Sequence, residues 1–172
     1  MSYTISRNRG YIEPRETRET DDPLIEGWDD DWSDWVAVMS PTRPTADWDI
    51  RDGDGYRLRP HRVSEIFGAP GGQTCGIYEF MAVKGRAKTF VVYVGSSCRS
   101  KRQSLPARIN EYCANGSHKA DLINDALAKG YTLYFRFKVA RNKREAENDE
   151  NSLLIYYSYA WNKRTITGTL PA

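Results

Sequence analysis

GIYEFMAV at residues 76–83 and TFVVYVG at residues 89–95 are two short stretches rich in β-branched and aromatic side chains. Such residues favour strands, and the intervening KGRAK at residues 84–88 supplies the glycine and charged side chains of a turn. The sequence therefore predicts a β-hairpin with a basic turn. This hairpin would bring Tyr78 and Tyr93 close together, and each tyrosine belongs to a glycine-containing tripeptide that strand formation alone does not require.

Further polar residues follow the predicted hairpin in a definite order. Arg108 and Tyr112 are four residues apart in a predicted helix at 105–114, so they share one helix face. Glu150 stands later in the chain and is followed at the third and fourth positions by leucines, and Asn162 comes 12 residues after it. A guanidinium can neutralise a phosphate and a carboxylate can hold a hard cation, so these are residue types that phosphodiester hydrolysis would need.

The tripeptides GIY at 76–78 and YVG at 93–95, with valine in place of the second isoleucine, resemble the signature of the GIY-YIG endonuclease superfamily. The resemblance continues in order to Asn162, and Ala146 stands four residues before Glu150 as in the family pattern. It implies a DNA endonuclease that hydrolyses phosphodiester bonds with a divalent metal ion and leaves 5′-phosphate and 3′-hydroxyl ends.

The resemblance also assigns a role to each residue of the set. Glu150 would be the metal ligand, and a lone carboxylate favours Mg²⁺, with Mn²⁺ as a substitute. Arg108 would contact the scissile phosphate. Tyr78 would act as general base or orient the attacking water, with Tyr93 supporting its hydroxyl and Tyr112 completing the cluster. A tyrosine with an ordinary pKa of about 10 needs nearby positive charge to act as a base at neutral pH.

Several assignments have competitors. Glu147, one turn before Glu150, is the rival ligand, although the residues that follow it fit the pattern less well. His118 and Asn162 are possible accessory residues. The alternatives are that His118 is only part of a helix start and that Asn162 locks the last helix or strand by side-chain hydrogen bonds. Basic residues after the second tripeptide are predicted to contact nucleic acid together with Arg108, namely Arg99, Lys101 and Arg102.

Charge divides the chain in two. Residues 1–55 contain 14 acidic and 6 basic side chains, a net charge of −8, whereas residues 56–172 contain 19 basic and 9 acidic side chains, a net charge of +10. An excess of positive charge is the electrostatic pattern of proteins that bind a phosphate backbone. We therefore predict an acidic, tryptophan-rich extension over 1–55 and a DNA-binding nuclease domain over 56–172.

The predicted fold class is α+β, with a small three-stranded antiparallel sheet flanked by helices in the order β-β-α-α-β-α. After the hairpin and the helix at 105–114, Ser117 and Gly130 are predicted to bound a helix at 117–130. Alternating apolar residues predict a strand at 131–139, and the last helix is predicted at 144–159.

The acidic extension permits two interpretations. Trp28, Trp32, Trp35 and Met39 recur at helical spacing, which favours an amphipathic element that buries its tryptophans against the domain. Alternatively, its carboxylates could compete with DNA for the basic surface. The stretch at residues 47–59, which runs from an Asp-Trp pair into a basic segment, faintly resembles the plant effector-of-transcription proteins, although their cysteine-rich repeats are absent here.

Composition limits the classes of protein to which the chain can belong. The three cysteines show no Cys-x-x-Cys spacing and are predicted to be free thiols. The sequence contains no apolar run of the roughly 18 residues that a membrane span needs. We therefore expect a soluble intracellular protein, nuclear or nucleoid-associated. The alternatives to a DNA endonuclease are a catalytically silent DNA-binding regulatory module and an RNA-processing nuclease.

Overall fold

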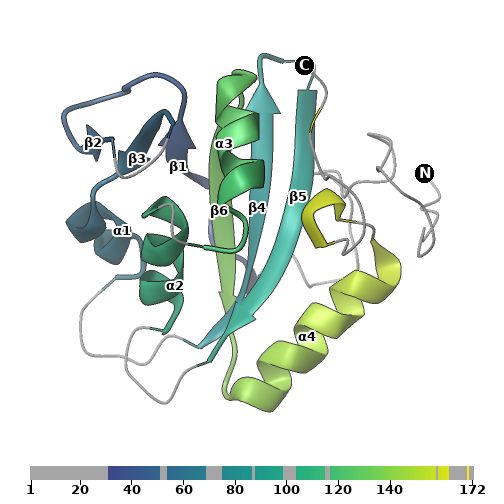
Figure 1. Ribbon diagram of the computed structural model, residues 1–172. Helices are drawn as coiled ribbons and strands as arrows, with labels where there is room; N and C mark the ends of the chain where they lie inside the picture. The colour runs from purple at the N-terminus through teal and green to yellow at the C-terminus, as the bar shows by residue number, and fades with distance from the viewer. Residues whose placement is uncertain are drawn as a thin grey trace.

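The computed structural model describes residues 31–50, 54–68, 75–86, 88–98, 104–114, 117–157, 159–162 and 170. Six antiparallel strands form one sheet in the order β2-β3-β1-β6-β4-β5 (Figure 1). The strands are β1 (Val36–Ser40), β2 (Trp48–Asp49), β3 (Tyr56–Leu58), β4 (Gly76–Lys84), β5 (Lys88–Ser97) and β6 (Thr132–Val139). The helices are α1 (Pro60–Ile66), α2 (Ser104–Cys113), α3 (Ala120–Ala128) and α4 (Lys143–Tyr156), followed by the 3-10 turn η3 (Ala160–Asn162).

The α+β class and the predicted hairpin are confirmed. β4 and β5 pair along their whole length, with Tyr78 opposite Gly95, and β6 pairs with the other side of β4. The sheet has six strands and not the predicted three, because β1, β2 and β3 extend it beyond β6. Two of these strands, β1 and β2, fall within the residues predicted as an extension.

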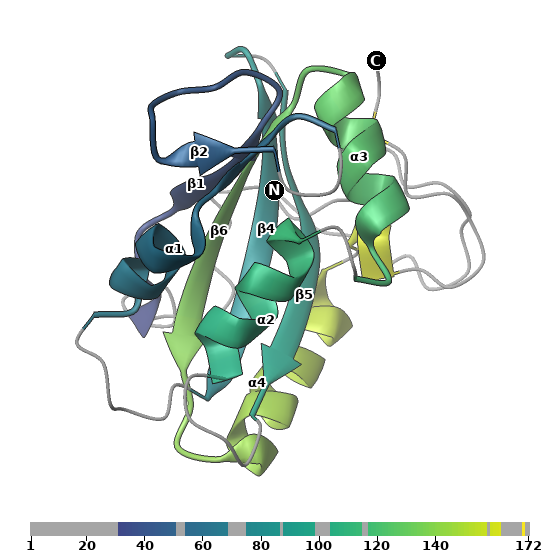
Figure 2. The same ribbon diagram turned by 60° about the vertical axis from the view of Figure 1, so that its left-hand side comes forward.

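Both faces of the sheet are covered, as Figure 2 shows. Apolar residues of α1, α2 and α3 pack in one core cluster with Tyr78 and Phe80 of β4. On the opposite face, α4 packs in a second cluster with Ile77 and Met81 of the same strand. The alternation of side chains along a strand divides its residues between the two cores.

In the described part of the tryptophan segment, the expected helical spacing gives way to a strand. Val36–Ser40 form β1, in which Val38 and Met39 are fully buried, because β-branched residues beside an open edge of β6 gain more from pairing than from a helical turn. Trp32 and Trp35 nevertheless pack as expected. Their rings lie 4.3 and 4.6 Å from the guanidinium of Arg136. Trp28 lies outside the described residues.

The guanidinium of Arg136 forms a buried ion pair with Glu79. Arg136 and Glu79 are opposite each other in β6 and β4, and Nε and a terminal nitrogen of the arginine donate to Glu79 Oε1 at 2.9 and 2.7 Å. Tyr159 donates to the other carboxylate oxygen at 2.6 Å. Because the charges are paired and hydrogen-bonded, the ion pair can be buried between sheet and tryptophans.

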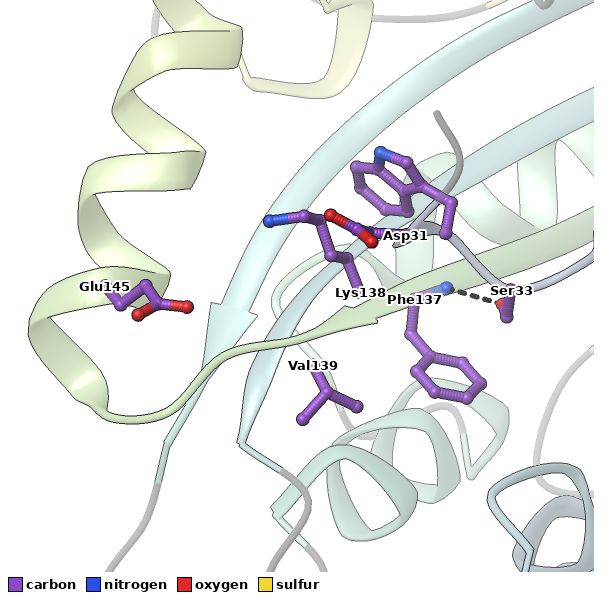
Figure 3. Close-up of a pocket in the computed structure, with 7 residues that line it drawn as sticks. Asp31, Ser33, Phe137, Lys138, Val139 and Glu145 are labelled. Carbon is purple, nitrogen blue, oxygen red and sulfur yellow. Dashed lines mark hydrogen bonds between the residues drawn. The ribbon is translucent and has the colours of Figure 1, made fainter. Parts of the chain in front are cut away.

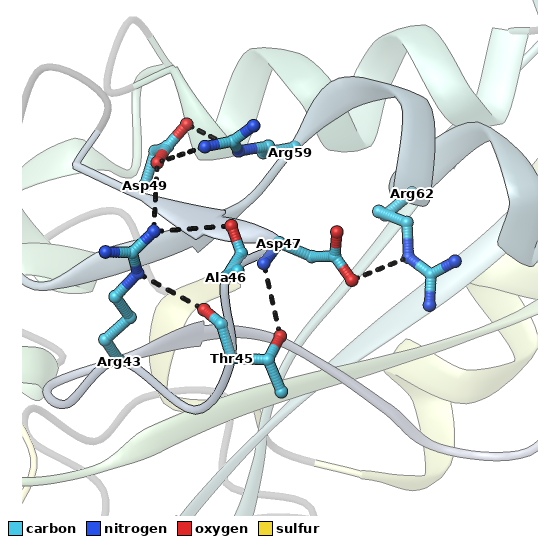
Figure 4. A network of polar contacts seen from close by, with 7 residues as sticks. All are labelled: Arg43, Thr45, Ala46, Asp47, Asp49, Arg59 and Arg62. Atoms are coloured by element: carbon cyan, nitrogen blue, oxygen red, sulfur yellow. Dashed lines mark hydrogen bonds and ion pairs between the residues drawn. The ribbon is translucent and has the colours of Figure 1, made fainter.

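The outer strands are held to α1 by a half-exposed ionic network (Figure 4). Asp49 of β2 lies 2.7 Å from Arg59 and 3.9 Å from Arg43, and Asp47 lies 3.4 Å from Arg62 of α1. Exposed ion pairs contribute little individually, at about 0–1 kcal/mol each. The network orients the short strand β2 more than it stabilises the fold.

Two helix boundaries differ from the predictions. The third helix begins at Ala120 because the Ser117 hydroxyl accepts a hydrogen bond from the Lys119 amide at 3.3 Å in a local turn. α4 ends at Tyr156, because Tyr157 is extended and buried in the second core cluster instead of continuing the helix.

The prediction of free cysteines was wrong for two of the three. Cys75 and Cys98 form a disulfide, with Cα atoms 4.4 Å apart, whereas Cys113 is a buried thiol. Gly76 pairs with Ser97, so the cysteines that flank these residues meet at the end of the hairpin. Within the described ranges, no helix has the length and apolar character needed to cross a membrane.

Candidate active site

Tyr78 of β4 contacts Arg108 and Tyr112 of α2. The hydroxyls of Tyr78 and Tyr112 share a hydrogen bond of 2.7 Å, and Arg108 Nε donates to the Tyr78 oxygen at 3.4 Å. Both tyrosines are 1% exposed, whereas Arg108 is half-buried. The predicted spacing of four residues therefore places Arg108 and Tyr112 on the helix face that covers β4.

The glycines of the two tripeptides are required by close packing. A Cβ atom on Gly95 would lie 2.5 Å from the Tyr78 hydroxyl, and one on Gly76 would collide with the backbone carbonyl of Lys138 in β6. Only glycine allows both approaches without a shift of the neighbours. These contacts explain why each tyrosine of the motif comes with a glycine.

Tyr93 connects the tyrosine pair to the start of α3. Its hydroxyl lies 3.5 Å from His118 Nε2, and its ring centroid is 6.2 Å from that of Tyr78 and 6.1 Å from that of Tyr112. The Lys119 ammonium sits 5.0 Å from the centre of the Tyr93 ring and donates to the carbonyl of Trp161. Three tyrosines from three different elements therefore share one cluster.

Glu150 of α4 is fixed by the residue that follows the second tripeptide. Ser96 Oγ donates to Glu150 Oε1 at 2.8 Å. Burial, partly offset by this hydrogen bond and reinforced by Glu147, raises the pKa of the Glu150 carboxyl above its ordinary value. Burial is the main cause of the raised pKa of Tyr93, followed by Tyr112, and the charge of Glu150 adds to it.

The rival ligand, Glu147, lies near a lysine of its own helix. Glu147 is exposed, and its carboxylate lies 3.8 Å from the ammonium of Lys143 on the same helix. Glu150 is the glutamate of this pair that is hydrogen-bonded to β5.

Asn162 of η3 bonds to the outer edge of β5. Its side-chain oxygen accepts from the Val94 amide at 3.0 Å, and its side-chain nitrogen donates to the Val94 carbonyl at 2.9 Å. These two bonds occupy the outward backbone groups of an edge strand, which would otherwise be free to pair. Asn162 thus holds η3 against β5, between Tyr93 and Gly95.

Burial determines the protonation of the cluster. Removal from water raises the pKa of Tyr78, Tyr93 and Tyr112 well above the ordinary phenol value, more than Arg108 lowers it. Burial, followed by the charges of Lys119 and Arg108, lowers the pKa of His118 below its ordinary value. At neutral pH the tyrosines are therefore protonated and the imidazole is neutral.

The structure brings Tyr78, Tyr93, Arg108, Tyr112 and His118 together in one cluster. Asn162 bonds to Val94 of β5, and Glu150 bonds to Ser96 of β5 from α4, which covers the other face of the sheet. Arg99, Lys101 and Arg102 lie outside the described residues. Sequence reasoning missed Ser96 and Lys119. The position of Ser96 directly after the second tripeptide was the available signal, because a residue there lies beside the motif tyrosines.

A separate pocket of about 570 Å³ lies between the start of the described chain, the end of β6 and α4 (Figure 3). Its polar lining includes Asp31, Lys138 and Glu145, and Ser33 accepts a hydrogen bond from the Phe137 amide at 2.9 Å. Lys138 is already paired with Asp149 at 3.0 Å. None of the predicted site residues lines this pocket.

Comparisons with known proteins agree with the motif. No curated protein and no solved structure matches the chain significantly. A family model described as GIY-YIG domain-containing protein matches residues 32–169, which include all six strands and the tyrosine cluster. The chain therefore belongs to the GIY-YIG domain family, whose members are generally endonucleases.

Proposed function

We propose that this protein is a divalent-metal-dependent endonuclease that hydrolyses phosphodiester bonds of DNA. The observation that carries the proposal is the meeting of Tyr78, Tyr112 and Arg108 beside Gly95, with a carboxylate held at the same strand by Ser96. The hydrolysis requires three components. These are a cationic side chain that binds the phosphate, hydroxyl groups that orient the attacking water, and a ligand that holds a metal ion.

The donor chemistry around Glu150 fits a hard divalent cation. The carboxylate is partly withdrawn from water and its oxygen Oε1 is oriented by the hydroxyl of Ser96, so a nearby cation would relieve its unfavourable burial. The described residues contain no group of three or more His, Cys, Asp or Glu side chains that could hold a metal. A single carboxylate leaves most ligand positions to water and phosphate, which is typical of Mg²⁺ and also suits Mn²⁺. Such an ion, when bound, would neutralise phosphate charge and lower the pKa of a bound water.

Arg108 would hold the scissile phosphate. Its guanidinium is half-buried and is already oriented by Tyr78 and by Glu111, whose carboxylate lies 3.0 Å away. A guanidinium in a partly desolvated site stabilises the charge that builds on the non-bridging oxygens. Because this contact is made to the DNA backbone and not to a base, Arg108 would contribute to cleavage at every DNA sequence.

Tyr78 would orient the attacking water as a neutral phenol. Its raised pKa makes the phenolate costly, and Arg108 and Tyr112 fix the position of its oxygen. Attack of water on phosphorus opposite the 3′ oxygen breaks that ester bond and leaves 5′-phosphate and 3′-hydroxyl ends. The net charge of +10 over residues 56–172 supports DNA as the partner, which would place the protein with chromosomal DNA in a nucleus or nucleoid.

A plasmid-cleavage assay tests the proposal. Purified protein is incubated with supercoiled DNA in Mg²⁺, in Mn²⁺ and in EDTA, and the new ends are examined by ligation and by end labelling. Nicked or linear products in metal but not in EDTA are expected. Glu150→Gln should lower the rate by about 10²–10³, the scale of one lost transition-state stabiliser.

Glu147→Gln is the matched control, because this exposed carboxylate lies one turn away on the same helix and should be dispensable. Equal loss in both variants would remove Glu150 from its assigned role. DNA binding without cleavage in any metal would favour the silent regulatory module, and faster cleavage of a structured RNA would favour the RNA-processing alternative.

A further inference from the structure

Two cationic side chains flank the tyrosine cluster, each over a different aromatic ring. The Arg108 guanidinium lies 5.3 Å from the centre of the Tyr112 ring, and the Lys119 ammonium lies 5.0 Å from the centre of the Tyr93 ring. The centres of these two rings are 6.1 Å apart. The two positive charges therefore lie over neighbouring rings of one cluster, one supplied by α2 and the other by the residue that precedes α3.

The two cations differ in how their charges are balanced. Arg108 forms an ion pair of 3.0 Å with Glu111 on its own helix. The ammonium of Lys119, which is also half-buried, donates to the carbonyl of Trp161 and lies over an aromatic ring. Among the residues that the structure describes, no carboxylate lies within ion-pair distance of this ammonium.

A partly buried charge without a counter-ion is unfavourable, and a bound anion would relieve it. Removal from water lowers the pKa of the Lys119 ammonium below its ordinary value. The Trp161 carbonyl and the Tyr93 ring offset part of this cost, but neither carries a net negative charge. A lysine ammonium also has more N–H donors than the single one that the carbonyl accepts. An anion beside Lys119 would accept from the remaining donors and favour the charged form.

His118 indicates that both cations act on the same region of the site. Its ring is exposed, and its centre lies 6.3 Å from that of Tyr93 and 6.3 Å from that of Tyr112. Burial lowers the pKa of His118 first, and the charges of Lys119 and Arg108 lower it further. A nucleic-acid strand carries one negative charge per nucleotide, so it is the kind of anion that can meet two neighbouring cations at once.

We propose that Lys119 binds a second, non-scissile phosphate of the DNA strand whose scissile phosphate is held by Arg108. This inference rests on the proposed function. Arg108 would act on the reacting phosphate, whereas Lys119 would fix the direction in which the strand crosses the tyrosine cluster. Lys119 is thus a substrate-binding residue that contributes to DNA affinity and not to the chemical step.

The salt dependence of DNA binding is the first test. Lys119→Gln removes the charge but keeps an N–H group that can donate to the Trp161 carbonyl. Affinity for a fluorescent DNA duplex is measured by anisotropy in EDTA, without cleavage, from about 50 to 200 mM salt. Each phosphate contact adds about 0.9 to the slope of log affinity against log salt. Lys119→Gln should lower the slope by about this amount, and Lys119→Arg should retain it.

Lys129→Gln is the matched control at the other end of α3. The Lys129 ammonium also donates to a backbone carbonyl, that of Leu170 at 2.8 Å, but it is paired with Asp125 at 3.0 Å. Its charge is already balanced, so the variant should lose stability and keep the wild-type salt slope. If Lys119 only held η3 through Trp161, Lys119→Gln would behave in the same way, with a lower melting temperature and an unchanged slope.

Kinetics on a mapped cleavage site supply the second test. Lys119→Gln should raise KM about 10-fold with little change in kcat, the scale of one lost charge-assisted hydrogen bond made equally before and during reaction. Single neutral methylphosphonates are then placed along the cleaved strand. At one non-scissile position the substitution should slow the wild type but not Lys119→Gln, because a contact that is already lost cannot be lost again.

The outcomes separate the two proposals. A wild type that binds DNA but cuts it in no divalent metal would overturn the proposed function, and the salt slopes would still decide the phosphate contact. An active wild type with the same salt slope as Lys119→Gln would overturn the contact alone. Additive losses of Lys119→Gln and the methylphosphonates at every non-scissile position would also overturn it.

Discussion

Gly95 and Tyr78 form one steric unit, although they belong to different tripeptides of the sequence. They are opposite each other in β5 and β4, and a Cβ atom on Gly95 would stand 2.5 Å from the tyrosine hydroxyl and 2.6 Å from the ring carbon that carries it. The glycine leaves the space in which the hydroxyl meets Arg108 and Tyr112. The absence of a side chain on Gly95 therefore determines where the Tyr78 hydroxyl can lie.

Gly95→Ala should displace Tyr78 and damage the site more than the fold. Overpacking of this kind costs about 1–3 kcal/mol in the free energy of unfolding. A displacement near 1 Å at a reacting group can lower the rate about 100-fold. Thermal unfolding and plasmid-cleavage rates measure the two effects.

Gly85→Ala is the matched control for this substitution. Gly85 lies in the turn between β4 and β5 with a φ of +62°, and nothing stands within 4 Å of a Cβ there. Its alanine variant should lose stability through backbone strain and keep its cleavage rate. Equal cleavage rates in the Gly95→Ala and wild-type proteins would show that the Tyr78 hydroxyl has no part in the reaction.

Ser96→Ala should weaken metal binding without removing the ligand. The serine hydroxyl orients Glu150 Oε1 at 2.8 Å, and loss of such a supporting bond typically lowers metal affinity about 10–100-fold. The measurement is the rise in melting temperature on titration with Mg²⁺ or Mn²⁺, together with the metal concentration for half-maximal cleavage.

Ser152→Ala provides the comparison, because Ser152 lies on the same helix as Glu150 and bonds only locally to the Asn148 carbonyl at 2.9 Å. Identical metal titrations of the Ser96→Ala and Ser152→Ala variants would contradict a supporting role for Ser96.

Glu150→Gln should stabilise the metal-free protein at neutral pH while it lowers the cleavage rate. The pKa of Glu150 is raised in the folded state, so the folded protein holds this proton more tightly than the unfolded chain does. The resulting stabilisation is present below the unfolded pKa and is lost as pH rises through the folded pKa. Ionised Glu150 therefore opposes folding at pH 7, and glutamine removes that charge while still accepting from Ser96.

The measurement is the melting temperature in EDTA at several pH values. Glu150→Gln should melt above the wild type at pH 7, and the difference should shrink toward pH 4. A variant that melts below the wild type at pH 7 would show that the carboxylate is stabilised by partners and not strained by burial.

Two deletions distinguish a packing role from an inhibitory role of the acidic segment. Removal of residues 1–55 takes β1 out of the sheet between β3 and β6, together with Trp32 and Trp35. This truncation should aggregate or unfold, because it exposes apolar surface and leaves Arg136 without its aromatic neighbours.

Removal of residues 1–30 keeps every described strand and deletes 8 acidic and 4 basic side chains. If these residues compete with DNA for the basic surface, DNA binding should tighten and its salt dependence should steepen. Unchanged affinity at low salt would exclude competition by this segment. A folded, stable protein lacking residues 1–55 would contradict the packing role of β1.

The family and the core of the site could be predicted from the sequence because the signals are local. The strand propensity of residues 76–83 and 89–95 predicts the hairpin, and hairpin pairing brings its two tyrosines together. A spacing of four residues places Arg108 and Tyr112 on one helix face. Glu150 was preferred over Glu147 by the leucines that follow it, and these belong to the face that packs on the sheet.

Tertiary structure alone decided the rest, because the relevant contacts join residues far apart in the chain. Helical spacing suggested an amphipathic helix near Trp32 and Trp35, but the free edge of β6 and the guanidinium of Arg136 decided otherwise. The disulfide required the register that pairs Gly76 with Ser97. The contacts of Tyr78 with Arg108 and Tyr112, and of Tyr93 with His118, exist only where β4, β5, α2 and the segment before α3 converge, since no periodicity of the sequence encodes which hydroxyl meets which partner.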